Sequence, residues 1–487
     1  MSEPASIEPD ALLTPSAIGY RDLRSVRGPL VVVGDATGVG WDEFARISVD
    51  GGPDRHGLVL EVDHDLATIQ VLEGTAGLAS GGVEVRFDGQ PLHVPVGDSW
   101  LGRVCNGRGE ALDSGPEVTG ERLAPVAGWP LNPVFREPPD EPVLTGVSVI
   151  DGLMTLVRGQ KLPIFSAAGL PHLELATQIA AQANARGRPF RVVFAAMGLT
   201  HTDIAFVRDR LEARSAAGEL VLLLNAADDP VIERILTPRI ALTIAEDLAY
   251  VGGQDVLVIM GDMTSYAEAL REVSAARKEI PARRGYPGYL YSDLATLYER
   301  CGRVRGRDGS VTVLPVLTMP GSDITHPVPD LTGYITEGQV VLDAEVQARG
   351  IYPPVDVLSS LSRLMRSGTG HGRTREDHQD VAAQVIAAIA RARSAAELAE
   401  LIGESALGET DRAFIAFRDA VERGFFAQGV DEQRDLDDTL TRAWQALAAL
   451  PKRELTMIPR EYVDRYRPSQ DQTTPAADPA RADGADG

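Results

Sequence analysis

Between Val143 and Val316 the chain alternates short, continuous apolar runs with helical patterns. Four of the runs consist largely of β-branched and Leu residues and are expected to be strands: Arg191 to Ala196, Leu220 to Leu224, Asp255 to Met260 and Val311 to Val316. Helices are expected between them, at Thr202 to Ala217, Pro238 to Tyr250 and Ser265 to Glu279. Apolar strands separated by helices predict a parallel sheet that is buried on both faces.

The segments on either side of this α/β core have different patterns. Before it, evenly spaced strands between Gly- and Asp-rich turns predict a small antiparallel β-barrel. These strands are expected at Pro29 to Gly34, Phe44 to Val49, Gly57 to Val62, Ala67 to Gly74 and Val83 to Phe87. After about residue 358, amphipathic Ala-rich stretches predict a helical bundle. They are Asp377 to Arg393, Ser405 to Phe426 and Leu436 to Leu450.

These patterns divide the chain into five parts. We predict a flexible lead (1–19), a β-barrel domain (20–96), an α/β domain of nucleotide-binding type (97–357), a helical domain (358–466) and a disordered tail (467–487). The α/β domain begins with an irregular connector rich in Gly and Pro. The tail is expected to be disordered because it consists mostly of Pro, Ala, Asp and Gly and has no periodicity.

The composition excludes several classes of protein. The 487 residues carry a net charge of -23, which disfavours a surface for nucleic acid or anionic lipid. The two cysteines, Cys105 and Cys301, suit a reducing compartment, and the eight histidines lack the spacing of a zinc site. Neither a secretory signal nor a transmembrane run is apparent, so any membrane link is expected to come through a partner.

One segment has the strand, loop and helix order of a phosphate-binding P-loop. The run Leu162 to Phe165 is the expected strand, and Ser166 to Pro171 is the loop before the helix. The pattern GxxxxGK[ST] would place its first Gly, second Gly, Lys and hydroxyl residue at Ser166, Pro171, His172 and Leu173. The loop therefore has the required length with different residues.

Each replacement removes a phosphate or metal contact. Pro171 has no N–H, His172 is shorter than Lys and mostly neutral near pH 7, and Leu173 cannot ligate Mg²⁺. Glu174 adds a negative charge in the first helical turn, where it would repel a phosphate. The degenerate loop, which also contains Gly169, is not expected to bind nucleotide well or to hydrolyse ATP. An ordinary strand-to-helix turn with Pro at the helix start remains an alternative.

Three further sets of residues could carry chemistry. Asp262 follows an apolar strand as a Walker B carboxylate does, although capping the next helix is the commoner role. The basic run from Arg271 to Arg284 could bind nucleic acid, but in so acidic a chain a subunit interface or a solvated helix face is favoured. Asp323, His326 and Asp330 could form a triad, whereas the prolines in the same loop favour a rigid turn. No metal site is predicted.

Six longer motifs are more specific than any single loop. They are FSAAGLPHLELATQIA, FAAMGLTHTD, NAADDPVIERILTPRIALTIAEDLAY, VLVIMGDMTSYAEALREVSAARKEIPARRGYPGYLYSDLATLYER, TMPGSDITHPVPDLTGYITEGQ and YPPVDVLSSLSRLM. From about Tyr20 to Tyr466 the chain resembles the B subunit of the V/A-type rotary ATPases. That resemblance implies a β-barrel crown, a P-loop NTPase-type α/β core and a helical C-terminal domain. The related F-type alpha subunit keeps the P-loop Lys and Thr, so His172 and Leu173 favour the V/A type.

The resemblance also implies a function. B subunits are non-catalytic or regulatory and alternate with catalytic A subunits in a hexameric head. The Arg of the SLSRLM motif, here Arg363, would act as an arginine finger that reaches the Mg-ATP or ADP of the neighbouring A subunit. No cofactor of the chain's own is expected. Arg363 would thus serve catalysis in another chain, whereas Arg366, about one turn further on, is not expected to do so.

Further partners follow from the same resemblance. The implied complex includes a central-stalk rotor and peripheral-stalk subunits, and it lies on the cytoplasmic face of a membrane. It couples ATP synthesis or hydrolysis to ion transport, with a proton expected, although the sequence does not choose between H⁺ and Na⁺. Two other classes remain as alternatives: a self-sufficient P-loop NTPase and a Rho-like hexameric RNA translocase. Both would need an intact P-loop, and the second would also need a basic RNA-binding face.

Overall fold

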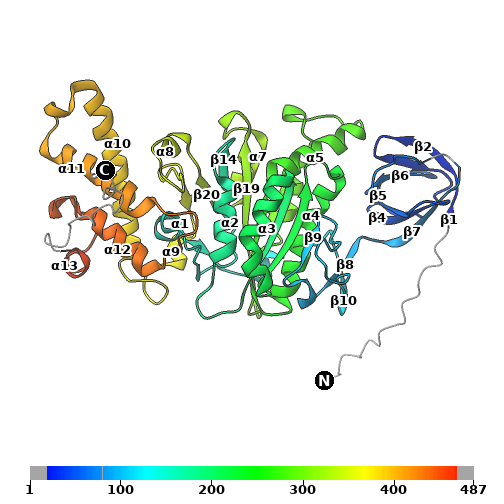
Figure 1. Cartoon of the computed structure of the whole chain (residues 1–487), viewed down its shortest axis with the longest axis horizontal. Helices are drawn as coiled ribbons and strands as arrows, with labels where there is room; N and C mark the ends of the chain where they lie inside the picture. Colours follow the sequence, from blue (N-terminus) through cyan, green and yellow to red (C-terminus); the bar gives the residue numbers. More distant parts are fainter. Residues whose placement is uncertain (1–18, 79–80, 469–487) are drawn as a thin grey trace, which may run out of the picture.

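A computed structural model of the chain describes residues 19–78 and 81–468. A β-barrel, an α/β core and a helical domain follow one another along the long axis of the molecule (Figure 1). The predicted fold class, an α/β core of P-loop NTPase type between a small β-barrel and a C-terminal helical bundle, is confirmed. The predicted flexible lead and disordered tail lie outside the described residues, apart from Gly19, Arg467 and Pro468.

The N-terminal domain is a seven-stranded antiparallel sheet that forms a nearly closed barrel. Its strands are β1 (Gly19–Tyr20), β2 (Leu23–Arg27), β3 (Leu30–Val33), β4 (Glu43–Val49), β5 (Arg55–Asp63), β6 (Leu66–Val71) and β7 (Val83–Pro91), in the order β1-β7-β4-β5-β6-β3-β2. Alternate side chains such as Ile47, Val59 and Ile69 fill the barrel and are fully buried. Because side chains alternate across a strand, their neighbours face outward, some of them toward the α/β core.

The central domain is built on a mostly parallel sheet with the order β21-β20-β14-β19-β17-β15-β16-β9. Its strands are β9 (Val104–Asn106), β14 (Ile164–Ala167), β15 (Phe190–Leu199), β16 (Leu220–Ala226), β17 (Asp255–Gly261), β19 (Ser310–Met319), β20 (Gly338–Val341) and β21 (Leu361–Ser362). Only β21 among these runs antiparallel to its neighbour. The four strands predicted around residues 191, 220, 255 and 311 are confirmed.

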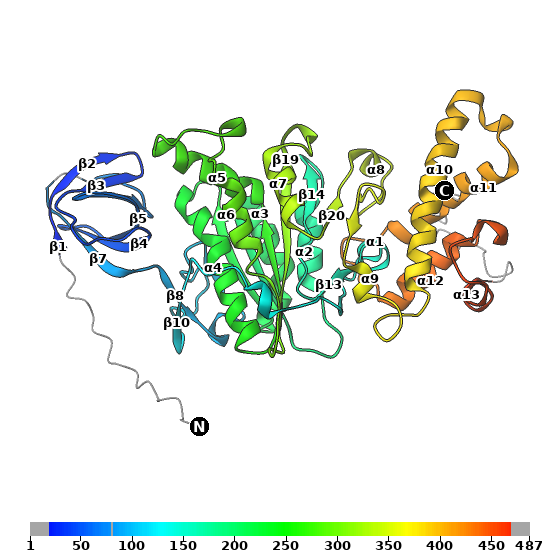
Figure 2. The same ribbon diagram turned by 180° about the vertical axis from the view of Figure 1, so that it is seen from behind.

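Helices cover both faces of this sheet, as the apolar strands predicted. On the face toward the viewer in Figure 1 lie α2 (His172–Gln182) and α3 (His201–Ala216). On the opposite face, in front in Figure 2, lie α4 (Val231–Tyr250), α5 (Met263–Ala276) and α6 (Leu290–Tyr298). Two hydrophobic clusters fill the two interfaces, and the one around α4 and α5 continues onto the outer surface of the barrel.

The structure corrects two expectations about the core. Helix α4 begins at Val231, not at Pro238, which lies inside the helix. We had placed Pro238 in the first turn because proline favours that position, but the apolar residues before it are buried against the sheet and extend the helix. The connector also contains short strands: β8 (His93–Val96), β10 (Arg122–Pro125), β11 (Arg136–Glu137) and β12 (Pro142–Val143), besides β9 in the core sheet.

The C-terminal domain is helical and packs against the end of the core. Its helices are α10 (His378–Ile402), α11 (Glu409–Val421), α12 (Leu436–Leu447) and α13 (Arg460–Tyr466). They contact α1 (Ser148–Leu153) of the core, and one continuous hydrophobic cluster spans the junction. The remaining short elements of the core are β13 (Leu156–Val157), β18 (Gly302–Val304), α7 (Pro327–Ile335), α8 (Ala344–Ala348) and α9 (Met365–Gly368).

A buried ion network joins the starts of three sheet segments. Asp255, at the first position of β17, is 1% exposed and accepts hydrogen bonds from Arg158 Nη2 at 2.6 Å and from Arg188 Nε at 2.7 Å. Ser310 Oγ at the start of β19 donates to the same carboxylate at 2.8 Å. Arg158 is itself 1% exposed, so removal of its partner would leave an uncompensated buried cation.

We therefore expect Asp255→Ala to lower the free energy of unfolding by about 3–5 kcal/mol. The matched control is Asp464→Ala, which breaks the exposed pair between Lys452 and Asp464 and should cost less than about 1 kcal/mol. Denaturant titration of the two variants measures both values. Similar losses in the two variants would contradict the role given to the buried network.

His378 generates a pH-dependent prediction at the junction with the C-terminal domain. Its Nε2 lies 3.0 Å from Gly152 O, and Thr374 Oγ1 lies 3.1 Å from Nδ1. Burial lowers the pKa of this imidazole to about 4. The unfolded chain binds a proton near the ordinary pKa of about 6.5, so stability from this group is present above that pH and is lost as pH falls toward 4.

Between pH 7 and pH 4, the contribution of His378 to the free energy of unfolding should fall by about 3 kcal/mol. The measurement compares wild type with His378→Gln, which cannot take up the proton, by denaturant titration at several pH values. All other titrating groups are common to both proteins, so they cancel in the difference. Parallel stability curves would show that the folded state tolerates a charged imidazole here.

Candidate functional site

The degenerate loop joins β14 to α2 at the carboxyl edge of the parallel sheet. Strand β14 lies between β19 and β20, and α2 starts at His172. Gly169 has φ +83°, a conformation that glycine adopts without a steric penalty. The strand, loop and helix order predicted for this segment is therefore present, at the sheet edge where open α/β sheets bind ligands.

The loop directs several of its polar groups inward. His172 N donates to Leu170 O at 2.8 Å, and Leu170 N donates to Ala167 O at 3.3 Å. The His172 ring nitrogen Nδ1 lies 2.9 Å from Leu170 O, and Ser166 Oγ donates to Ala167 O at 2.9 Å. A P-loop needs such N–H groups to point at phosphate oxygens. Here the loop's own carbonyls accept them, and Pro171 has no N–H to offer.

Asp262 acts as a helix cap. It precedes α5, and its Oδ1 accepts hydrogen bonds from Thr264 N at 2.8 Å and Thr318 N at 3.1 Å. Its Oδ2 accepts from Thr318 Oγ1 at 2.6 Å. Burial raises the pKa of this carboxyl, while the bonds from Thr318 and Thr264 oppose the rise. Both oxygens are thus engaged by protein donors, which agrees with the capping interpretation and does not suit a metal ligand.

Arg363 lies at the far edge of the same sheet, directly after β21. Its backbone N donates to Glu337 O at 2.9 Å, and its Nη1 donates to Thr336 O at 2.8 Å. The side chain is exposed, and no carboxylate within residues 19–78 and 81–468 forms an ion pair with it. The guanidinium therefore keeps most of its donors for a group outside this chain.

The backbone that carries Arg363 is held by a polar network that the sequence did not reveal. Ser362 Oγ accepts from Gln160 Nε2 at 2.9 Å and donates to Thr155 O at 3.1 Å. Lys161, which is 3% exposed, pairs with Glu299 at 2.8 Å and with Glu337 at 2.9 Å. Its backbone N also donates to Glu337 Oε2 at 2.9 Å.

These contacts join residues immediately before β14 to the segment just before Arg363. They would keep the base of the arginine in place if its side chain reached outward. The run RGQK before a predicted strand was the only signal in the sequence, and it does not indicate the partners. Arg366, on α9, is also exposed, and its carbonyl accepts from Gln379 Nε2 at 3.0 Å.

The other sequence candidates have structural roles. Asp323 accepts from Thr325 N at 2.9 Å and from Arg284 at 2.7 Å, while the His326 ring packs edge-on against Tyr286. Arg277 and Arg283 pair with Glu279 and Asp330, so this basic run meets carboxylates within its own chain. In the described part of the chain, no group of three or more His, Cys, Asp or Glu side chains could hold a metal ion.

The helices also bear on the membrane question. Across residues 19–78 and 81–468, none is both long and apolar enough to span a bilayer.

Comparisons with known proteins match all three parts of the chain. A family model described as the ATP synthase alpha/beta family, nucleotide-binding domain, matches residues 146–362. The beta-barrel domain of the same family matches residues 24–89, and the C-terminal domain of V and A type ATP synthase matches residues 367–467. The third match specifies the V and A type.

A solved structure gives the same result over most of the chain. It is that of a unique ATP synthase subunit, NeqB, from Nanoarcheaum equitans. The two chains are 35% identical, and the match covers 87% of this chain and 100% of that chain with a TM-score of 0.69. The likeness therefore extends over more than one of the three domains.

The geometry of the loop predicts that the isolated chain binds Mg-ATP weakly or not at all and does not turn it over. The double variant His172→Lys, Leu173→Thr should not restore binding, because Pro171 still lacks an N–H and still constrains the loop. Adding Pro171→Gly to that variant should strengthen binding. Isothermal titration calorimetry of the three proteins tests this, and micromolar affinity of the unmodified chain would contradict it.

Proposed function

This chain belongs to the ATP synthase alpha/beta family in its V and A type, and on that premise we propose that it is the non-catalytic B subunit of the head. It alternates there with catalytic A subunits and supplies Arg363 to the nucleotide site at the A–B interface. The observation that carries this proposal is the combination of an exposed Arg363 on an anchored backbone with a P-loop whose donors face inward. A subunit of this kind would act on ATP bound by its neighbour.

The chemistry of arginine suits such a role. Its guanidinium is permanently charged and planar, so two N–H groups can contact phosphate oxygens at once. Negative charge spreads over these oxygens in the transition state of phosphoryl transfer, and a cation placed in advance stabilises that state most. An arginine finger supplied by another chain is worth on the order of 10³–10⁵ in turnover. The hydrogen bonds at Ser362 and Glu337 support this role because they fix the backbone beside the finger.

The rest of the proposed assembly follows from the family. Mg-ATP or ADP would lie at the A–B interface, bound chiefly by the A subunit. Central-stalk and peripheral-stalk subunits would join the head to the membrane on its cytoplasmic face. Through that complex, ATP synthesis or hydrolysis would be coupled to ion transport, with a proton as the expected ion.

The two alternative functions have less support. A self-sufficient P-loop NTPase would need loop amides directed at phosphate, whereas His172 N and Leu170 N donate to loop carbonyls. A Rho-like RNA translocase would need basic side chains facing nucleic acid. Several arginines of the one basic run, including Arg277 and Arg284, are paired with carboxylates of this chain.

The proposal predicts that Arg363→Ala lowers the ATPase rate of a reconstituted A–B head by about 10³-fold or more. Arg363→Lys should recover little of the rate, because Lys keeps the charge but loses the bidentate geometry. The measurement is steady-state ATP hydrolysis by complexes whose assembly is confirmed by size and subunit stoichiometry.

Arg366→Ala is the matched control for this experiment. It removes a second exposed arginine three residues further on, and it should leave turnover within a few-fold of wild type. Near wild-type turnover with Arg363→Ala would exclude Arg363 as the finger. An equal loss with Arg366→Ala would show that any change of charge at this surface impairs the head.

A further inference from the structure

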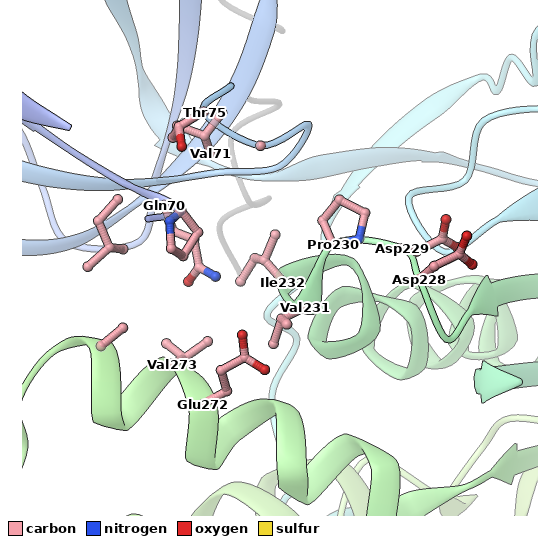
Figure 3. Close-up of a pocket in the computed structure, with 14 residues that line it drawn as sticks. Gln70, Val71, Thr75, Asp228, Asp229, Pro230, Val231, Ile232, Glu272 and Val273 are labelled. Carbon is pink, nitrogen blue, oxygen red and sulfur yellow. The ribbon is translucent and has the colours of Figure 1, made fainter. Parts of the chain in front are cut away.

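A cavity of about 350 Å³ lies between the β-barrel and the α/β core, away from the edge of the sheet that carries Arg363. Strands β3 and β6 and the turn after β6 form its barrel side, and the start of α4 and the last turns of α5 form its core side (Figure 3). Its volume is at the lower end of the range for small-molecule sites. Neither the family nor the proposed role of Arg363 assigns a function to it.

Gln70 is the polar group on the barrel side of this cavity. It follows Ile69, which fills the barrel, and therefore its own side chain lies on the outer face of β6. Gln70 is 1% exposed, and its Oε1 has no hydrogen-bond partner among the described residues. An unpaired amide oxygen in an apolar interface is unfavourable, so its presence here suggests that a donor from outside the chain completes it.

Glu272 is the polar group on the core side. It extends from α5 toward the space into which the Gln70 amide points (Figure 3). Its carboxylate forms no ion pair within the part of the chain that the structure describes. Arg234 is the cation that interacts with it electrostatically, but Arg234 donates its hydrogen bonds to Asn225 Oδ1 at 3.0 Å and to backbone carbonyls of Ala226 and Ala227.

The remaining walls determine what shape of ligand would fit. They are mainly aliphatic, and the side chains involved are Leu30, Val71, Val231, Ile232, Val273 and Ala276. Asp228 and Asp229 also line the cavity but have other partners: Asp228 pairs with His201 at 3.1 Å, and Asp229 accepts from Ala226 N at 2.6 Å. An apolar body with one hydrogen-bond donor group would match these walls and the two free acceptors.

We propose that this cavity binds a small organic monocation, an alkylammonium or alkylguanidinium, with its charged head between Gln70 Oε1 and the Glu272 carboxylate. The aliphatic part of the ligand packs against the apolar walls on both sides of the junction. A cation is favoured over a neutral donor because Glu272 is unpaired and hydrogen bonds between charged groups are stronger than neutral ones. Since barrel and core each contribute one acceptor, the bound ligand would also strengthen the contact between these two domains.

The test titrates the full-length chain with four probes of equal chain length: n-butylammonium, n-butylguanidinium, n-butanol and butyrate. Binding is followed by calorimetry and by the shift in melting temperature at constant ionic strength. We expect both cations to bind at least about ten times more tightly than butanol, because only they form charge-assisted hydrogen bonds. Butyrate should not bind. Equal binding of cations and butanol, or no binding of either cation, would overturn the proposal.

Three variants locate the site. Glu272→Gln should weaken binding of the cations about tenfold or more, and Gln70→Leu about three- to tenfold. Glu212→Gln is the control, because Glu212 is an exposed carboxylate on α3 that does not line the cavity and should leave affinity unchanged. Glu272 is on the surface of α5, so its variant decides the question even if Gln70→Leu alters the fold. Unchanged affinity in Glu272→Gln would refute the assignment.

Discussion

The pairing of β20 with both β14 and β21 is the interaction on which the candidate site depends. Strand β20 runs parallel to β14, which leads into the degenerate loop, and antiparallel to β21, which leads into Arg363. Gly338, where β20 begins, allows this close approach, because a Cβ there would lie 2.3 Å from Leu361 O. The same short strand therefore fixes the loop and the arginine at one end of the sheet.

The two halves of that edge differ in how they use their polar groups. In the loop, N–H groups donate to carbonyls of the same loop, and both oxygens of Asp262 accept from protein donors. At Arg363 the reverse holds, since one Nη1 contact to Thr336 O leaves the other guanidinium donors to solvent or to a neighbouring chain. A site that is closed within the chain and open toward a partner is suited to act across an interface. This contrast supports the regulatory, non-catalytic role.

The sequence predicted the features that depend on local pattern. Apolar runs located the sheet strands, alternation in short strands located the barrel, and the loop spacing located the turn between β14 and α2. It could not predict contacts between distant residues, such as Lys161 with Glu337 or Gln160 with Ser362, because charge or polarity at one position does not specify a partner far along the chain. Local preference also misled at Pro238, where burial of the preceding residues outweighed the preference of proline for a helix start.

The two junctions of the core show why the barrel side is the place for a ligand. At the C-terminal junction the buried polar groups complete one another: Gln428 Oε1 accepts from Ser148 N at 2.9 Å, and Gln428 Nε2 donates to Gly146 O at 2.7 Å. At the barrel junction Gln70 is equally buried, yet its carbonyl oxygen has no partner among the described residues. A fold that pairs its polar groups at one junction has no general need to leave them unpaired at the other. The unpaired Gln70 oxygen beside a cavity is therefore better explained by a missing donor than by loose packing.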